Sequence, residues 1–116
     1  MRVVKVVNQT NGAVVGDHVE VADTSLTRFW GLLGRRGLEA GRGLWIKPSS
    51  GVHTLGMMFT IDVVGLDKDL NVVKLWKRIV PFRVTSVNLK IKSVVELPAG
   101  HIDANGISLG DKLAIQ

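Results

Sequence analysis

The sequence predicts a mainly β fold, either an antiparallel sandwich or a partly closed barrel of about seven or eight short strands with one short helix. Apolar residues make up 46% of the chain, and most are Val, Leu and Ile rather than aromatic. Glycine is frequent, with 13 residues against three prolines, which favours tight turns between strands. The length of 116 residues suits one domain that spans residues 1–116.

The first predicted elements are two strands, at residues 2–7 and 14–21. Asn11 and Gly12 between them form a pair typical of β-hairpin turns. A helix is predicted next, over 25–34. Its apolar residues have the spacing of one helical face: Leu26, Phe29, Trp30 and Leu33.

The rest of the chain predicts further strands with little helix between them. These strands are expected at 44–47, 59–66, 72–80, 87–92, 93–97 and 112–115. The turn at 67–71 indicates a second hairpin. Residues 87–92 alternate strictly between apolar and polar, which is typical of a strand with one buried face. Residues 100–105 fit a single helical turn before a glycine.

The composition excludes several classes of site. The chain has no cysteine, so disulfides, thiolate metal ligands and a nucleophilic thiol are ruled out. The three histidines are far apart in the sequence and do not have metal-site spacing, so we expect no metal and no cofactor. The N-terminus has neither a signal-peptide core nor a membrane-spanning run, so we expect a cytoplasmic location. The sequence does not reveal the oligomeric state.

The formal charge of +5 raises the question of a polyanionic partner. A basic group lies on and after the strand expected at 72–80, and the predicted strand 87–92 would extend it. Its members are Lys74, Lys77, Arg78, Arg83, Lys90 and Lys92, with Trp76 among them. Such a surface can bind nucleic acid, but lysines also protect edge strands from aggregation. The even spread of basic residues along the chain favours the second explanation.

Several segments together resemble a prokaryotic family of uncharacterised proteins, domain of unknown function number 192. The matching segments run over most of the chain from residue 26 to residue 115: 28–34 (RFWGLLG), 43–48 (GLWIKP), 52–57 (VHTLGM), 59–63 (FTIDV), 95–100 (VELPAG) and 110–111 (GD). The resemblance implies a small, mainly β, sandwich-like fold with one short helix. It implies no activity, because none is established for the family. Many relatives carry an export signal, and we expect none in this chain.

One position departs from the family pattern. Relatives with the Val-His-Thr motif usually carry cysteine after the proline, where this chain has Ser49. A cysteine–histidine pair suggested by those relatives therefore cannot operate here. A serine could replace the thiol only if a neighbouring base activated it.

The candidate site consists of polar residues in apolar surroundings. Its members are Arg28, Ser49, His53, Thr54, Asp62 and Glu96. His53 is the candidate general base, because imidazole titrates near neutral pH, and Asp62 or Glu96 could orient its ring. Asp62 lies within an apolar run, where a carboxylate must be paired or accept several hydrogen bonds, from loop amides or from Arg28.

Three functions remain open from the sequence, beside a purely structural polar network. A small-molecule or peptide binding module with a pocket around His53, Asp62 and Glu96 is the first hypothesis. Binding of nucleic acid or another polyanion through the basic strands is the second. A hydrolase-like enzyme that uses His53 as base is the third. The sequence does not decide whether the protein is an enzyme.

Overall fold

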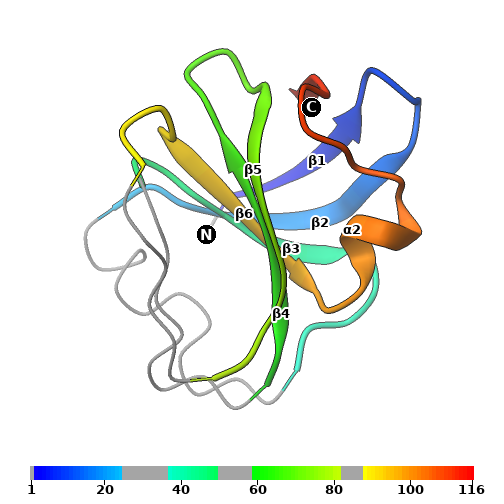
Figure 1. Ribbon diagram of the computed structural model, residues 1–116. Coiled ribbons are helices and arrows are strands. Elements are labelled where there is room, and N and C mark those ends of the chain that lie inside the picture. Colours follow the sequence, from blue (N-terminus) through cyan, green and yellow to red (C-terminus); the bar gives the residue numbers. More distant parts are fainter. Residues whose placement is uncertain (1, 25–36, 50–58, 82–87) are drawn as a thin grey trace.

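A computed structural model describes residues 2–24, 37–49, 59–81 and 88–116 (Figure 1). The described strands are β1 (Val3–Asn8), β2 (Val14–Ala22), β3 (Arg42–Ile46), β4 (Ile61–Leu66), β5 (Val72–Ile79), β6 (Ser93–Pro98) and β7 (Leu113–Ile115). The described helix is α2 (His101–Ala104), at the position where a helical turn was expected. The helix predicted over 25–34 lies outside the described residues.

The seven strands form one curled sheet with the order β5-β4-β6-β3-β2-β1-β7. The mainly β class is therefore confirmed, and the architecture is the partly closed barrel rather than the sandwich. The start of β5 lies against the segment before β7, which brings the two edges of the sheet together. Val72 N donates to the carbonyl oxygen of Asp111 at 2.8 Å, and Leu113 N donates to that of Leu70 at 2.9 Å. These bonds close one end of the curl (Figure 1).

The sheet differs from the sequence-based expectations in two ways. Antiparallel pairing was expected for the sandwich alternative, but β2 and β3 pair in parallel, with Val21 opposite Trp45. Parallel neighbours need a connection that returns to the starting end of the sheet, and residues 23–41 make it. The strand expected over 87–92 is also absent from its described part, because residues 88–92 form a turn. Asn88 accepts hydrogen bonds there from Lys90 N through Oδ1 and from Ile91 N through its carbonyl oxygen.

The predicted hairpins are confirmed. β1 and β2 pair antiparallel around Gly12, whose φ of 78° is accessible to glycine at little cost. β4 and β5 pair antiparallel around the Asp67–Asn71 turn. In that turn Asp67 Oδ1 accepts hydrogen bonds from Asp69 N and Asn71 N, both at 2.9 Å.

The curl gives the sheet an inner and an outer face, each with its own core. The inner cluster receives side chains from every strand and from α2: Val6, Val15, Val19, Val21, Trp45, Val64, Leu66, Val72, Val95, Leu97, Ile102, Ile107 and Leu113. The outer cluster lies mainly on the central strands: Ala22, Leu44, Ile61, Val63, Ile91 and Val94. All residues of β4 and β6 are buried, because both faces of these strands are covered.

Candidate functional site

Asp62 lies on the inner face of β4. It pairs with Leu97 of β6, a member of the inner cluster, and its side chain is 1% exposed. Its Oδ1 accepts a hydrogen bond from Arg78 N, and its Oδ2 accepts one from Ile102 N in α2, both at 2.9 Å. Backbone amides of β5 and α2 therefore satisfy the buried carboxylate, whereas loop amides were expected in this role. Arg28, the other expected donor, lies outside the described residues.

The bond to Arg78 coincides with an irregularity in β5. Opposite Asp62 the register between β4 and β5 shifts, so that Ile61 pairs with Ile79 and Val63 with Trp76. The strand β5 thus has an extra residue here, and Arg78 has a φ of 55°. A β-bulge of this kind turns an amide away from the ladder. The carboxylate of Asp62 accepts a hydrogen bond from that amide, and through its two bonds it joins both α2 and the bulge of β5 to β4.

Glu96 lies on the opposite face of the sheet. It pairs with Leu44 on one side and with Val63 on the other, and both belong to the outer cluster. Its side chain is buried. Because Asp62 is next to Val63 on β4, and neighbouring residues of a strand point to opposite faces, the structure does not bring Asp62 and Glu96 together.

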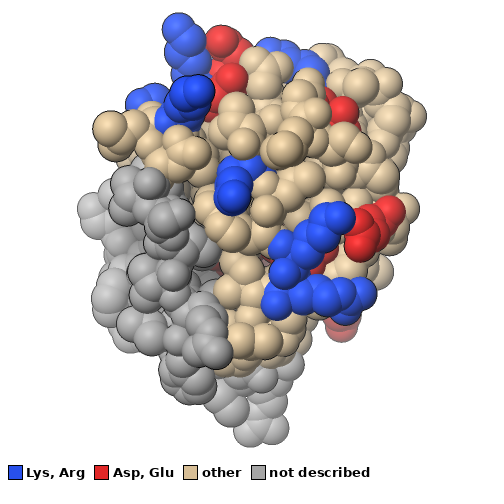
Figure 2. Space-filling view, in the orientation of Figure 1, with Lys and Arg blue, Asp and Glu red and all other residues tan. Residues whose placement is uncertain are grey.

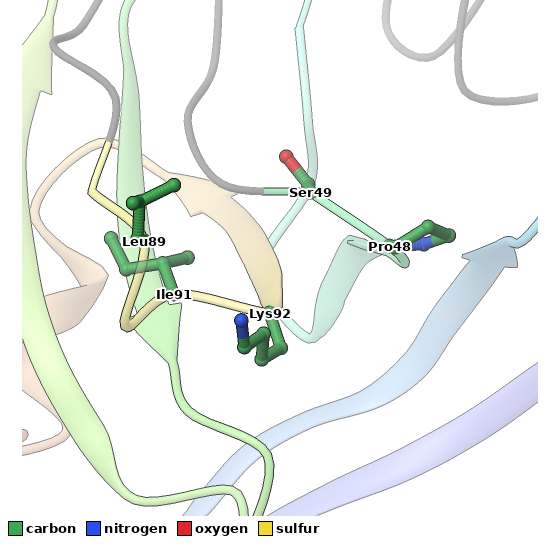
Figure 3. Close-up of a pocket in the computed structure, with 5 residues that line it drawn as sticks. All are labelled: Pro48, Ser49, Leu89, Ile91 and Lys92. Atoms are coloured by element: carbon green, nitrogen blue, oxygen red, sulfur yellow. The ribbon is translucent and has the colours of Figure 1, made fainter.

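Ser49 lines a pocket at the end of the outer face. The pocket has a volume of about 360 Å³, and it lies between the segment that follows β3 and the turn that precedes β6: Pro48, Ser49, Leu89, Ile91 and Lys92 (Figure 3). Ser49 N donates a hydrogen bond of 2.9 Å to the carbonyl oxygen of Lys92, which joins the two segments. We call this pocket the Ser49 recess.

The Ser49 recess combines an apolar lining with two polar groups. Ile91 is buried and belongs to the outer cluster, whereas the Leu89 side chain is 80% exposed. The Ser49 hydroxyl and the Lys92 ammonium lie at different places on the lining (Figure 3). Such a site can hold a small molecule with an apolar part and polar ends.

Sequence reasoning identified Ser49 but missed the other lining residues. Residues 87–92 were interpreted as a strand, so Lys92 was considered only as part of a basic surface. The Asx turn that Asn88 makes with Lys90 N was the available signal, because asparagine favours such turns. His53, Thr54 and Arg28 lie outside the described residues.

The basic group on β5 is accompanied by acidic residues. Lys74, Lys77 and Arg78 are exposed, but Lys77 Nζ lies 2.7 Å from Asp103 Oδ1. This contact, as a hydrogen bond and as an ion pair, holds the pKa of Asp103 below its usual value. Figure 2 shows basic side chains in separate groups, several beside acidic ones, on the face in view. Lys90 and Lys92 lie in a turn rather than on a strand that would extend this surface.

The described ranges contain no group of three or more histidine, cysteine, aspartate or glutamate residues that could hold a metal ion. No helix in them is long and apolar enough to cross a membrane.

Comparison with known proteins places the fold and the sequence in one family. Residues 6–115 match DUF192, a family described as "Uncharacterized ACR". The chain belongs to the DUF192 family. A UPF0127 protein of Pyrococcus furiosus is 34% identical over 114 residues, which cover 91% of this chain and 93% of that protein. A UPF0127 protein of Thermococcus sibiricus is 33% identical over 112 residues, which cover 92% and 71% of the two chains.

Two solved structures have the same fold as this DUF192 chain. A protein of unknown function from Novosphingobium aromaticivorans superposes with a TM-score of 0.81 at 23% identity, over 97% of this chain and 83% of that one. A proposed transcription regulator from Sinorhizobium meliloti gives a TM-score of 0.80 at 21% identity, over 97% and 91%. At these identities the similarity concerns the fold alone. The function of this DUF192 chain is unknown.

Proposed function

We propose that this DUF192 protein is a binding module for a small molecule or a short peptide, and that the Ser49 recess receives the ligand. The observation that carries the proposal is the pocket of about 360 Å³ between two segments joined by the bond from Ser49 N to the Lys92 carbonyl oxygen. This volume is at the small end of the range for ligand pockets. A buried floor at Ile91 and an exposed rim at Leu89 provide apolar surface that a ligand can cover.

Fragment screening by ¹H–¹⁵N NMR tests this proposal. We expect bound fragments to shift the amides of residue 49 and of residues 89–92. Leu89→Ala should weaken binding by about 1 kcal/mol, roughly fivefold, because the ligand loses the apolar surface of the leucine. Leu109→Ala is the matched control, since Leu109 is 65% exposed and does not line the recess. A screen without shifts in these segments, or equal losses in the two variants, would contradict the proposal.

A contribution of His53 and Thr54 to this binding site stays a prediction, because both lie outside the described residues. If His53 and Thr54 contribute to the same site, His53→Ala should weaken fragment binding without shifting the thermal midpoint. Hydrolysis by the Ser49 hydroxyl would need a base, and no histidine lines the part of the recess that the structure describes. The apolar surface of Leu89 and Ile91 in the lining supports a binding role.

Polyanion binding through β5 is the second candidate. Exposed Lys74, Lys77 and Arg78 support it, whereas the salt bridge from Lys77 to Asp103 reduces the available charge. Retention on heparin at low salt, lost steeply as salt rises, is the expected sign of this function. Elution in the low-salt wash would end this candidate.

A further inference from the structure

The lysines around the Ser49 recess indicate the charge of its ligand. The two segments that form the recess contain Lys90 and Lys92 and no acidic residue. Lys47, the residue before the recess on the other segment, is placed differently, because its Nζ lies 4.2 Å from the centroid of the Trp45 ring. Lys92 is thus the lysine that lines the pocket. None of the salt bridges between described residues involves its side chain.

Apolar side chains and the lysine line the same small pocket, so the ligand is expected to have an apolar part close to its charged group. Leu89 and Ile91 supply apolar contacts beside Lys92, and the Ser49 hydroxyl supplies a second polar group away from it (Figure 3). An ammonium selects an anion through a charge-assisted hydrogen bond. A hydroxyl can donate to a carbonyl or accept from an amide.

We infer that the Ser49 recess binds a carboxylate that carries an apolar side chain next to it, as an N-acylated amino acid or the carboxyl end of a peptide does. The carboxylate lies at the Lys92 ammonium, the apolar side chain lies against Leu89 and Ile91, and the amide of the ligand faces Ser49. This inference rests on the proposed function and specifies its ligand class.

N-acetyl-leucine is the probe, and N-acetyl-leucinamide is its uncharged match. Both are titrated against the full chain by ¹H–¹⁵N NMR. We expect the carboxylate to bind about tenfold more tightly, because only the carboxylate forms a charge-assisted bond. Lys92→Met should abolish this preference while preserving most of the apolar side-chain length. Lys90→Met is the control, since Lys90 is exposed in the same turn but does not line the recess.

A longer probe separates the two sources of such a carboxylate. If acetyl-Gly-Gly-Leu shifts the same amides with at least the affinity of N-acetyl-leucine, the peptide end is the source. If only N-acetyl-leucine binds, the source is the free acylated amino acid. In either case rising salt should weaken the carboxylate preference of the wild-type protein.

Four results would overturn the inference, and they separate it from the proposed function. Equal affinity for the acid and the amide would refute the carboxylate specificity and leave the recess as a binding site. Binding of other fragments at the recess, but of neither leucine derivative, would do the same. If no fragment binds at the recess, the proposed function fails together with the inference. An equal loss of preference in the Lys90 and Lys92 variants would refute the role of Lys92.

Discussion

Replacement of Asp62 by alanine tests whether its buried carboxylate holds the fold. The substitution removes the acceptor from the amides of Arg78 and Ile102, each bonded at 2.9 Å. A buried amide left without a partner costs about 1–3 kcal/mol, so the two amides together cost about 2–6 kcal/mol. This is a large part of the 5–15 kcal/mol that typically stabilises a domain. We therefore expect Asp62→Ala to be severely destabilised.

Urea unfolding, followed by tryptophan fluorescence, gives the measurement. With a slope of roughly 1–3 kcal/mol per molar urea, a loss of about 3 kcal/mol moves the midpoint by roughly 1–3 M. Asp62→Asn keeps one carbonyl oxygen and should lose about 1–3 kcal/mol, so it stays measurable if the alanine variant does not fold. Asp69→Ala is the control on the exposed turn and should change stability by less than about 0.5 kcal/mol. If Asp62→Ala is as stable as this control, the reasoning is refuted.

Two further predictions concern the turn at Asp67 and the close packing at Gly43. Burial raises the pKa of Asp67, but hydrogen bonds from the backbone and side chain of Asn71 lower it more. The pKa is thus below the unfolded value of about 3.9, and the stabilisation is complete above that pH and is lost as pH falls through the folded pKa. Asp67→Ala should lower the free energy of unfolding by at most about 1 kcal/mol at pH 7, because solvent screens this site. If the wild type and the variant differ as much in urea titrations at pH 2 as at pH 7, the ionised carboxylate is not the source of the stabilisation. Gly43→Ala should destabilise by about 1–3 kcal/mol, since its Cβ would lie 2.8 Å from a β6 carbonyl oxygen. Gly37→Ala is the control, because a Cβ there meets nothing within 4 Å, and it should unfold at the wild-type temperature. Equal thermal midpoints for the two variants would contradict the prediction and would show that β6 can move to make room for the new Cβ.

Local sequence features predicted the elements whose causes are themselves local. The Asn11-Gly12 pair marked the first hairpin, and the turn at 67–71 marked the second, because these residues stabilise turns without distant contacts. The parallel pairing of β2 with β3 was missed because it depends on contacts between residues about 24 positions apart, such as Val21 and Trp45. The alternation at 87–92 misled the prediction, since a short Asx turn can contain the same pattern of apolar and polar residues.

The candidate site shows a similar limit. Asp62 and Glu96 each lie in a strand buried on both faces, so no alternation between polar and apolar residues reveals which face either side chain occupies. A change of one residue in the register would have put both carboxylates on the same face. The pairing of Val63 with Glu96 decides which face each carboxylate occupies, and this pairing is a contact between distant parts of the chain. The Ser49 recess was likewise beyond prediction, because it joins two segments about 40 residues apart in the sequence.

The filled interior of the barrel restricts where a ligand can bind. Side chains from all seven strands meet in the inner cluster, and Ile102 of α2 is buried among them. Among the described residues, side chains thus occupy the interior, as they do in many small barrels. Asp62 adds to this by fixing α2 and β5 through two backbone amides, which is a structural use of a buried carboxylate. Recognition is therefore expected outside the barrel, at the end of the outer face, where Ser49 and Lys92 border a pocket on a scaffold held rigid by the two clusters.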